Sequence, residues 1–171
     1  VRVGADGGGD GVELGLVPSV FGEMPDGPAD QLVVAGAVVG PILPGNGPQV
    51  GGGKGAGEVH GGFRHALDSI WPQLLATLPQ ARSWWCCGHS LGGALAAMAA
   101  LRVQDAGAHL AGVITFGQPR VGDQRHAERL AGLPLLRVVN ACDLVPELPP
   151  EALGYRHAGT LRHLDAHRRE N

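Results

Sequence analysis

The sequence predicts an α/β fold, with a mostly parallel central sheet covered by helices on both faces as a three-layer sandwich. From residue 58 onward, short apolar runs alternate with longer segments in which apolar residues recur every three or four positions. That alternation is typical of parallel strands joined by crossover helices. The chain has 171 residues, of which 44% are hydrophobic and 17% charged. This composition indicates a globular chain with a sizeable core rather than a disordered one.

The first 57 residues differ from the rest of the chain. They are rich in glycine and proline, which favours turns and loops because glycine loses the most backbone freedom on ordering. One apolar run, 31–39, predicts a strand. We therefore divide the chain into a poorly defined N-terminal segment, 1–57, and an α/β core, 58–171.

Three helices are expected in the core. Apolar residues at three- and four-residue steps over 63–78 mark one helical face, which Pro72 should kink. Alanine and leucine dominate 90–106, which ends at a glycine and predicts a second helix. Asp123 is a suitable N-cap for a short third helix that stops at Gly132.

Strands are expected between and after these helices. The apolar runs that predict them are 83–87, 109–117, 135–140 and 160–165. Strands that alternate with helices in this way pair in parallel, because each crossover returns the chain to the same end of the sheet.

Charge, hydropathy and cysteine content exclude several classes of protein. The net charge of −3 gives no basis for binding nucleic acid or an anionic membrane surface. No apolar run reaches the roughly 18 residues of a transmembrane segment. No signal peptide is visible, so secreted and cytoplasmic locations both stay open. The three cysteines, Cys86, Cys87 and Cys142, form neither a disulfide framework nor a metal site.

Residues 88–92, Gly-His-Ser-Leu-Gly, match G-x-S-x-G between an expected strand and an expected helix. In that setting the pattern predicts a sharp turn that raises a serine hydroxyl above the sheet edge. The helix N-terminus contributes partial positive charge where an oxyanion would form. Ser90 is therefore the candidate nucleophile, and the backbone N–H of Leu91 is a candidate oxyanion-hole donor.

A serine nucleophile needs a base, and the base needs a group that orients it. On this kind of sheet the partners follow in the order serine, acid, histidine. Asp143 comes just after the strand 135–140 and is the candidate acid. The alternative is that Asp143 is a solvated loop residue. Asp123 competes for the role, but helix capping accounts for it.

Four segments together resemble the class 3 lipases, the fungal-lipase-like α/β-hydrolases. They are VHGGFRHAL (59–67), GHSLGGALA (88–96), ITFGQPRVGD (114–123) and RVVNACDLVPELPPEALGYRHAG (137–159). The resemblance implies Ser90 as nucleophile, Leu91 as oxyanion donor and Asp143 as the acid. It also implies scaffold roles for Pro119, Arg120, Pro146 and Pro149, carboxylester or triacylglycerol substrates, and no cofactor. All of these motifs lie between residues 58 and 160, so we expect a hydrolase fold that is incomplete at both ends.

The chain departs from the family pattern at the oxyanion hole and at the base. The Arg-Gly-Thr or Arg-Gly-Ser of the family's early strand is absent; an amide near residues 35–37 is the candidate replacement. The lid helix is not recognisable, and the stretch 41–57 is where a replacement would lie. His157 matches a scaffold histidine of the family, which leaves His163 and His167 as candidate bases. His167 follows the last expected strand and is the tentative base. The alternative is that both are tail histidines and the base is missing.

Three hypotheses about function follow. The first is a serine carboxylester hydrolase, a lipase or esterase that forms an acyl-enzyme on Ser90 and acts on esters or lipids, also at an oil–water interface. The second is a catalytically impaired fragment or pseudoenzyme of the same fold. The third is an acyltransferase or thioesterase, which the same serine would serve. The spacing of His163 and His167 lacks the glutamate of a zinc-protease motif, so no metal is expected.

Overall fold

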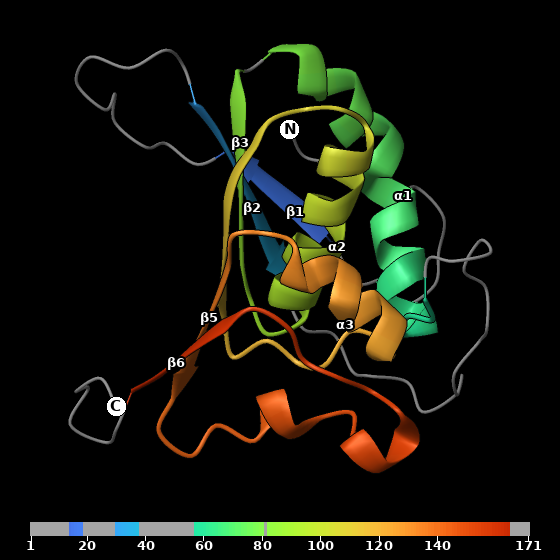
Figure 1. The fold of residues 1–171 in the computed structure, drawn as a ribbon. Coiled ribbons are helices and arrows are strands. Elements are labelled where there is room, and N and C mark those ends of the chain that lie inside the picture. Colours follow the sequence, from blue (N-terminus) through green and yellow to red (C-terminus); the bar gives the residue numbers. More distant parts are fainter. Residues whose placement is uncertain (1–13, 19–29, 38–56, 81, 165–171) are drawn as a thin grey trace, which may run out of the picture.

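The computed structural model describes residues 14–18, 30–37, 57–80 and 82–164, and in them the chain forms one sheet with helices packed on it (Figure 1). The six strands lie in the sheet in chain order. They are β1 (Leu14–Pro18), β2 (Asp30–Ala37), β3 (Ser83–His89), β4 (Leu110–Phe116), β5 (Leu135–Asn140) and β6 (Thr160–Leu164). Strands β2 to β6 are parallel, and β1 is antiparallel to β2. The predicted α/β class with a mostly parallel sheet is confirmed.

Three α-helices connect or precede the central strands: α1 (Gly61–Thr77), α2 (Leu91–Asp105) and α3 (Gln124–Ala131). In Figure 1 all three lie on the same side of the sheet. Each connection from β2 to β5 moves to the next strand in the same direction, and right-handed crossovers then place every helix on one face. Within the described ranges the fold therefore consists of two layers, and no α-helix covers the opposite face of the sheet.

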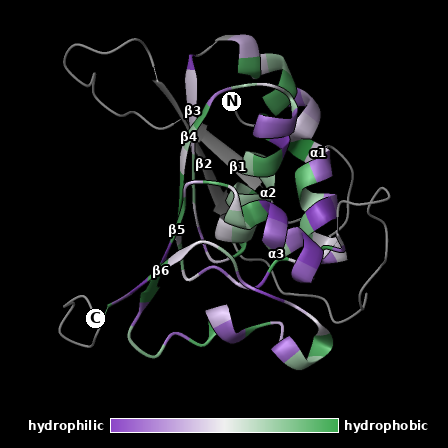
Figure 2. Cartoon of the chain, in the orientation of Figure 1, coloured by the Kyte–Doolittle hydropathy of each residue, from purple (hydrophilic) through white to green (hydrophobic). Residues whose placement is uncertain are grey.

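The core lies between the sheet and α2. This helix is buried along nearly its whole length, including its run of alanines. Its small side chains let it approach the sheet closely, and Leu95 packs there with Cys86 of β3 and Val113 of β4. Helices α1 and α3 contribute Leu67 and Leu130 to the same cluster. Figure 2 shows the corresponding hydrophobic colour on the central strands and α2.

The opposite face of the sheet is apolar and partly open to solvent. Trp85 and Phe116 project there and are 36% and 42% exposed. The Trp85 ring lies against Gly112 of the neighbouring strand, in the space that a side chain at residue 112 would fill. The adjacent Trp84 points the other way and is buried, so the two tryptophans belong to different faces of β3.

Most of the expected elements are present with small changes at their ends. The run 31–39 forms β2, and 160–165 forms β6. Helix α1 continues through Pro72, and Asp123 caps α3 by accepting the His126 backbone N–H at 2.8 Å. Strand β1 was not predicted, because its five residues lie among glycines and, within the described part of the chain, β1 is an edge strand paired with β2.

Candidate active site

The predicted nucleophile and acid lie at the same edge of the sheet. Strands β3 and β5 are both parallel to β4 between them, so their carboxyl ends meet at one edge. Ser90 directly follows β3, and Asp143 lies three residues after the end of β5. Gly117, just after β4, lies between the two.

The Ser90 corner, residues 88–93, joins β3 to α2 with a single residue between them. Ser90 has φ 53° and ψ −122°, a backbone conformation that residues other than glycine rarely adopt. Such residues cost about 1–3 kcal/mol and occur where the surrounding structure imposes them, often in active sites. Here the Ser90 N–H donates to Phe116 O at 2.9 Å, while the Ser90 carbonyl accepts the Gly93 N–H at 2.9 Å.

The backbone is crowded on both sides of the serine, and glycine is required before it. A Cβ at Gly88 would overlap the backbone carbonyl of Gly92, so no side chain fits where strand and helix meet. A Cβ at Gly93 would lie 3.2 Å from Gly88 O and from Gln118 Cβ. These contacts supply the physical reason for the glycine pattern around Ser90: the helix begins against the strand that it follows.

The oxyanion-hole candidates gather near the same corner. Helix α2 begins at Leu91, and the first N–H groups of a helix have no carbonyl partner within it, so they are available to an anion. The register of β2 on β3 pairs Ala35 with Gly88. Residues 35–37 therefore end at the same edge as Ser90. This is where the sequence predicted the amide that replaces the family's Arg-Gly-Thr donor. The proposed lid replacement, 41–57, lies outside the described residues except for Gly57.

The Asp143 turn, residues 140–145, begins where β5 ends. Asp143 donates its backbone N–H to Asn140 O at 3.1 Å, and its Oδ1 accepts the Val145 N–H at 3.0 Å. Oδ2 lies 2.5 Å from the point that a Cβ at Gly117 would occupy. Because Gly117 has no side chain, the carboxylate reaches over the end of β4, toward the strand that carries Ser90. His89 Nε2 lies 3.7 Å from the same point.

The segment that follows the Asp143 turn is fastened to a buried arginine. Arg120 is 6% exposed. Its backbone N–H donates to Leu148 O at 2.7 Å, and its guanidinium donates to the carbonyls of Glu147 and, at 3.2 Å, Pro149. The guanidinium also pairs with the carboxylates of Glu147 and Glu151 at 3.3 and 3.2 Å. The scaffold role that the sequence assigned to Arg120 thus has a direct structural basis.

The candidate histidines differ in what their rings contact. His163 Nε2 lies 2.9 Å from Ala141 O, at the start of the Asp143 turn. His157 Nε2 lies 2.8 Å from Pro146 O. Burial, together with the nearby positive charge of Arg137, lowers the pKa of His157 to about 4, so this ring is neutral at neutral pH. His167, the predicted base, lies outside the described residues.

Two residues near the site were not identified from the sequence: His89 and Gly117. His89 is the variable residue before the serine in G-x-S-x-G, and its strand position gives no reason to expect its ring near Gly117, at the end of the neighbouring strand. Gly117 has φ 55° and follows β4 directly. A glycine at the end of the expected strand 109–117, at the sheet edge that carries Ser90, was the available signal.

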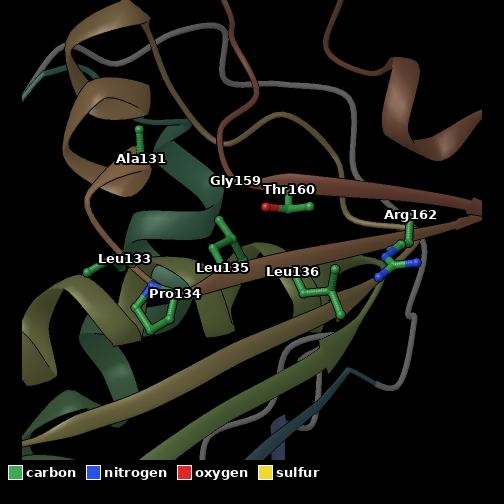
Figure 3. Close-up of a pocket in the computed structure, with 8 residues that line it drawn as sticks. All are labelled: Ala131, Leu133, Pro134, Leu135, Leu136, Gly159, Thr160 and Arg162. Atoms are coloured by element: carbon green, nitrogen blue, oxygen red, sulfur yellow. The ribbon is translucent and has the colours of Figure 1, made fainter.

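A groove lies at the other edge of the sheet. It has a volume of about 510 Å³ and is lined by residues between α3 and the starts of β5 and β6, including Leu135, Gly159 and Thr160 (Figure 3). Because these are the amino ends of the strands, the groove contains none of the candidate catalytic residues. Among the described residues there is no group of three or more His, Cys, Asp or Glu side chains that would hold a metal ion. None of the described helices is long and apolar enough to cross a membrane.

Comparison with known proteins identifies one family. The model of the family described as "Lipase (class 3)" matches residues 39–153. The lipase of Rhizomucor miehei is 40% identical over 124 residues, which cover 66% of this chain and 33% of that protein. The secreted mono- and diacylglycerol lipase 1 of Fusarium solani is 34% identical over 116 residues, 63% of this chain and 34% of that protein. The chain thus spans about a third of the length of these relatives.

Solved structures agree with the sequence matches. A triacylglycerol lipase whose catalytic centre is described as a serine protease triad superposes with a TM-score of 0.62 at 34% identity, over 75% of this chain and 51% of that one. The triacylglyceride lipase of Rhizomucor miehei gives a TM-score of 0.60 at 35% identity, over 66% of this chain and 47% of that one. The α/β fold and its parallel sheet therefore match the structures of fungal lipases over the superposed part of the chain.

Proposed function

This chain belongs to the class 3 lipase family, and from that membership we propose that it carries the nucleophile and acid of a serine carboxylester hydrolase. Ser90 is the nucleophile, and Asp143 is the acid that orients the catalytic imidazole. His167 is the proposed base. The substrates are acylglycerols or related carboxylic esters, as the names of the relatives from Rhizomucor miehei and Fusarium solani suggest.

The observation that carries this proposal is the conformation of Ser90. Its positive φ, on a one-residue corner between a strand and a buried helix, has no packing role that glycine would not fill at lower cost. A serine kept there is explained by a hydroxyl that must stand at the sheet edge above the helix N-terminus. The carboxylate of Asp143, which reaches over Gly117 toward that corner, supports the role of Asp143 as the acid of the proposed triad.

The proposed reaction has two steps. The base removes the Ser90 hydroxyl proton while Oγ attacks the ester carbonyl, and the resulting oxyanion accepts hydrogen bonds from the Leu91 N–H and an amide of residues 35–37. Collapse breaks the ester bond, and the alcohol leaves with the proton from the base. Water, deprotonated by the same base, then releases the acid from Ser90. Both steps use side chains and backbone alone, so no cofactor is proposed.

A fluorophosphonate probe tests the nucleophile directly. We expect stoichiometric labelling of Ser90, found by peptide mass spectrometry, and none in Ser90→Ala. Absence of an adduct on the wild-type chain would contradict the proposal and support the catalytically impaired alternative.

The base is tested by comparing His167→Ala with His163→Gln. Loss of labelling in the first, with near wild-type labelling in the second, is expected; equal labelling of His167→Ala and wild type would reject His167. Hydrolysis of short and long acyl esters, with and without an oil interface, then separates an esterase from a lipase. Acyl transfer to an added alcohol or release from a thioester, in place of ester hydrolysis, would favour the acyltransferase or thioesterase alternative.

A further inference from the structure

Ala141, the first residue after β5 in the Asp143 turn, has an unfavourable backbone conformation. Ala141 has φ 46°, and among the described residues only Ser90 and Ala141 have a positive φ without being glycine. A conformation of this kind persists only where neighbouring groups impose it. Ala141 is two residues before Asp143, so whatever holds Ala141 also sets the direction in which Asp143 leaves the sheet.

Two groups of β6 bond to the Ala141 backbone. The Ala141 N–H donates to Leu164 O at 2.7 Å. The Ala141 carbonyl lies 2.9 Å from Nε2 of His163. The first bond continues the backbone ladder between β5 and β6, but the second is made by a side chain and depends on the identity of residue 163.

The contact determines the state of the His163 ring. A carbonyl oxygen can only accept, so Nε2 must carry the proton and donate it. A catalytic base in a triad has the reverse arrangement: its Nδ1–H donates to the acid, and its Nε2 is free to take the serine proton. His163 is therefore occupied on the nitrogen that a base would use.

We propose that His163 is a positioning residue for Asp143: its Nε2–H holds the Ala141 carbonyl, and with it the left-handed turn that aims the carboxylate over Gly117. The inference rests on the proposed catalytic role of Asp143. It assigns to His163 a function other than general base, and it makes β6 part of the machinery that orders the site.

Residues 146–149, which follow the Asp143 turn, are held by other side chains. The contribution of His163 can therefore be measured separately from theirs. Arg120 and His157 bond to carbonyls of residues 146–149. Between these anchors and Ala141, the bonds that Asp143 makes within the described part of the chain are the two local ones to Asn140 and Val145. Loss of the His163 bond therefore releases the start of the Asp143 turn, while the segment that follows the turn, 146–149, stays attached.

The first test needs no variant and no activity. Long-range ¹H–¹⁵N spectra of the wild-type imidazoles report which ring nitrogen carries the proton. We expect the Nε2–H tautomer for His163 at neutral pH. A predominant Nδ1–H tautomer would overturn the proposal, because the ring could not then donate to Ala141.

The second test compares His163→Gln with His163→Leu. A glutamine side-chain NH₂ can reach the position of Nε2 and donate to Ala141, whereas leucine fills similar space without a donor. We expect the Leu variant to exchange the Asp143 amide about tenfold faster and to label Ser90 more slowly by on the order of tenfold, and the Gln variant to restore both. Equal behaviour of the two variants would contradict a hydrogen-bonding role.

The third test asks whether the effect acts through Ala141. Ala141→Gly removes the cost of the positive φ, so the turn no longer depends on an external hold. The effect of His163→Leu on Asp143 amide exchange should shrink in the Ala141→Gly background, and full additivity would reject the coupling. If the wild-type chain fails to label at Ser90, the proposed function fails, yet the tautomer and the exchange cycle still decide the role of His163.

Discussion

The Ser90 corner and the Asp143 turn lie at the same edge of the sheet, but they are held in different ways. The Ser90 corner is built mainly from neighbours in the sequence: Gly88 meets Gly92, and the carbonyl of Ser90 accepts from Gly93. One bond comes from outside the corner, from the Ser90 N–H to Phe116 O. The Asp143 turn and the segment after it are fastened by residues from elsewhere in the chain, among them Arg120 and His163.

Because of this difference, the two regions should be disrupted by different kinds of substitution. A local corner fails when a side chain is added within it, because the strand and helix must then separate. A turn held from a distance fails when a remote donor is removed, even though its own sequence is unchanged. The predictions below test that contrast, beginning with the largest expected effect.

Gly88→Ala should cause the largest loss. The added methyl group would overlap the backbone carbonyl of Gly92, which cannot turn away as a flexible side chain could. We expect the free energy of unfolding to fall by about 3 kcal/mol or more, measured by urea denaturation. Gly132→Ala is the matched control, since its Cβ would have only an ordinary 3.5 Å contact with Arg129 O at a negative φ. A similar loss in both variants would show that the tight corner is not the cause.

Arg120→Met should destabilise the region of the Asp143 turn while leaving the Ser90 corner intact. The methionine fills space but leaves the carbonyls of Glu147 and Pro149 without their donor. We expect a loss of about 2–3 kcal/mol.

Amide exchange locates this effect: the Val145 N–H should exchange faster and the Gly93 N–H should not change. Arg129→Met serves as the control, because the Arg129 pair with Asp105 is largely exposed and should contribute less than about 1 kcal/mol. Faster exchange at Gly93 would contradict separate fastening of the two regions.

Acid should weaken the region of the Asp143 turn before carboxylates titrate. Burial lowers the pKa of His157 from 6.5 in the unfolded chain to about 4 in the fold, so below pH 6.5 the unfolded chain binds more protons. The contribution of the neutral His157 ring to the free energy of unfolding is therefore fully present above pH 6.5, and it is lost as the pH drops toward 4.

Between pH 7 and 5 we expect a loss of about 1–2 kcal/mol, allowing for partial solvent screening. His157→Gln keeps a donor for Pro146 and should flatten that part of the profile. His60, whose pKa burial also lowers, adds the same sign in both proteins. Parallel profiles for wild type and His157→Gln would refute the assignment.

The smallest effect is a gain. Ser90→Gly removes the cost of a positive φ at the Ser90 corner, whereas Ser90→Ala keeps it. We expect the glycine variant to be more stable than the alanine variant by about 1 kcal/mol, with both unlabelled by a fluorophosphonate. Equal stability would mean that the corner conformation carries no cost.

The same contrast explains which predictions from the sequence succeeded. The helix of Leu91–Asp105 and the strand of Leu135–Asn140 were predicted nearly to the residue, because apolar periodicity and terminating glycines are local features. Strand β1 was missed, since its stability comes from pairing with β2. The second helical layer was expected from the strand–helix alternation, whereas the sheet order places the described helices on one face.

The sequence by itself determined the α/β class, the family and the serine corner, because the spacing of glycines around Ser90 already encodes a tight strand–helix contact. Only the tertiary structure decided how Asp143 is held. The β5–β6 register brings His163 to the Ala141 carbonyl, and the fold buries Arg120 beneath residues 147–149. Such contacts join residues twenty or more positions apart. They depend on how the strands and loops are arranged in the fold, so no local sequence pattern predicts them.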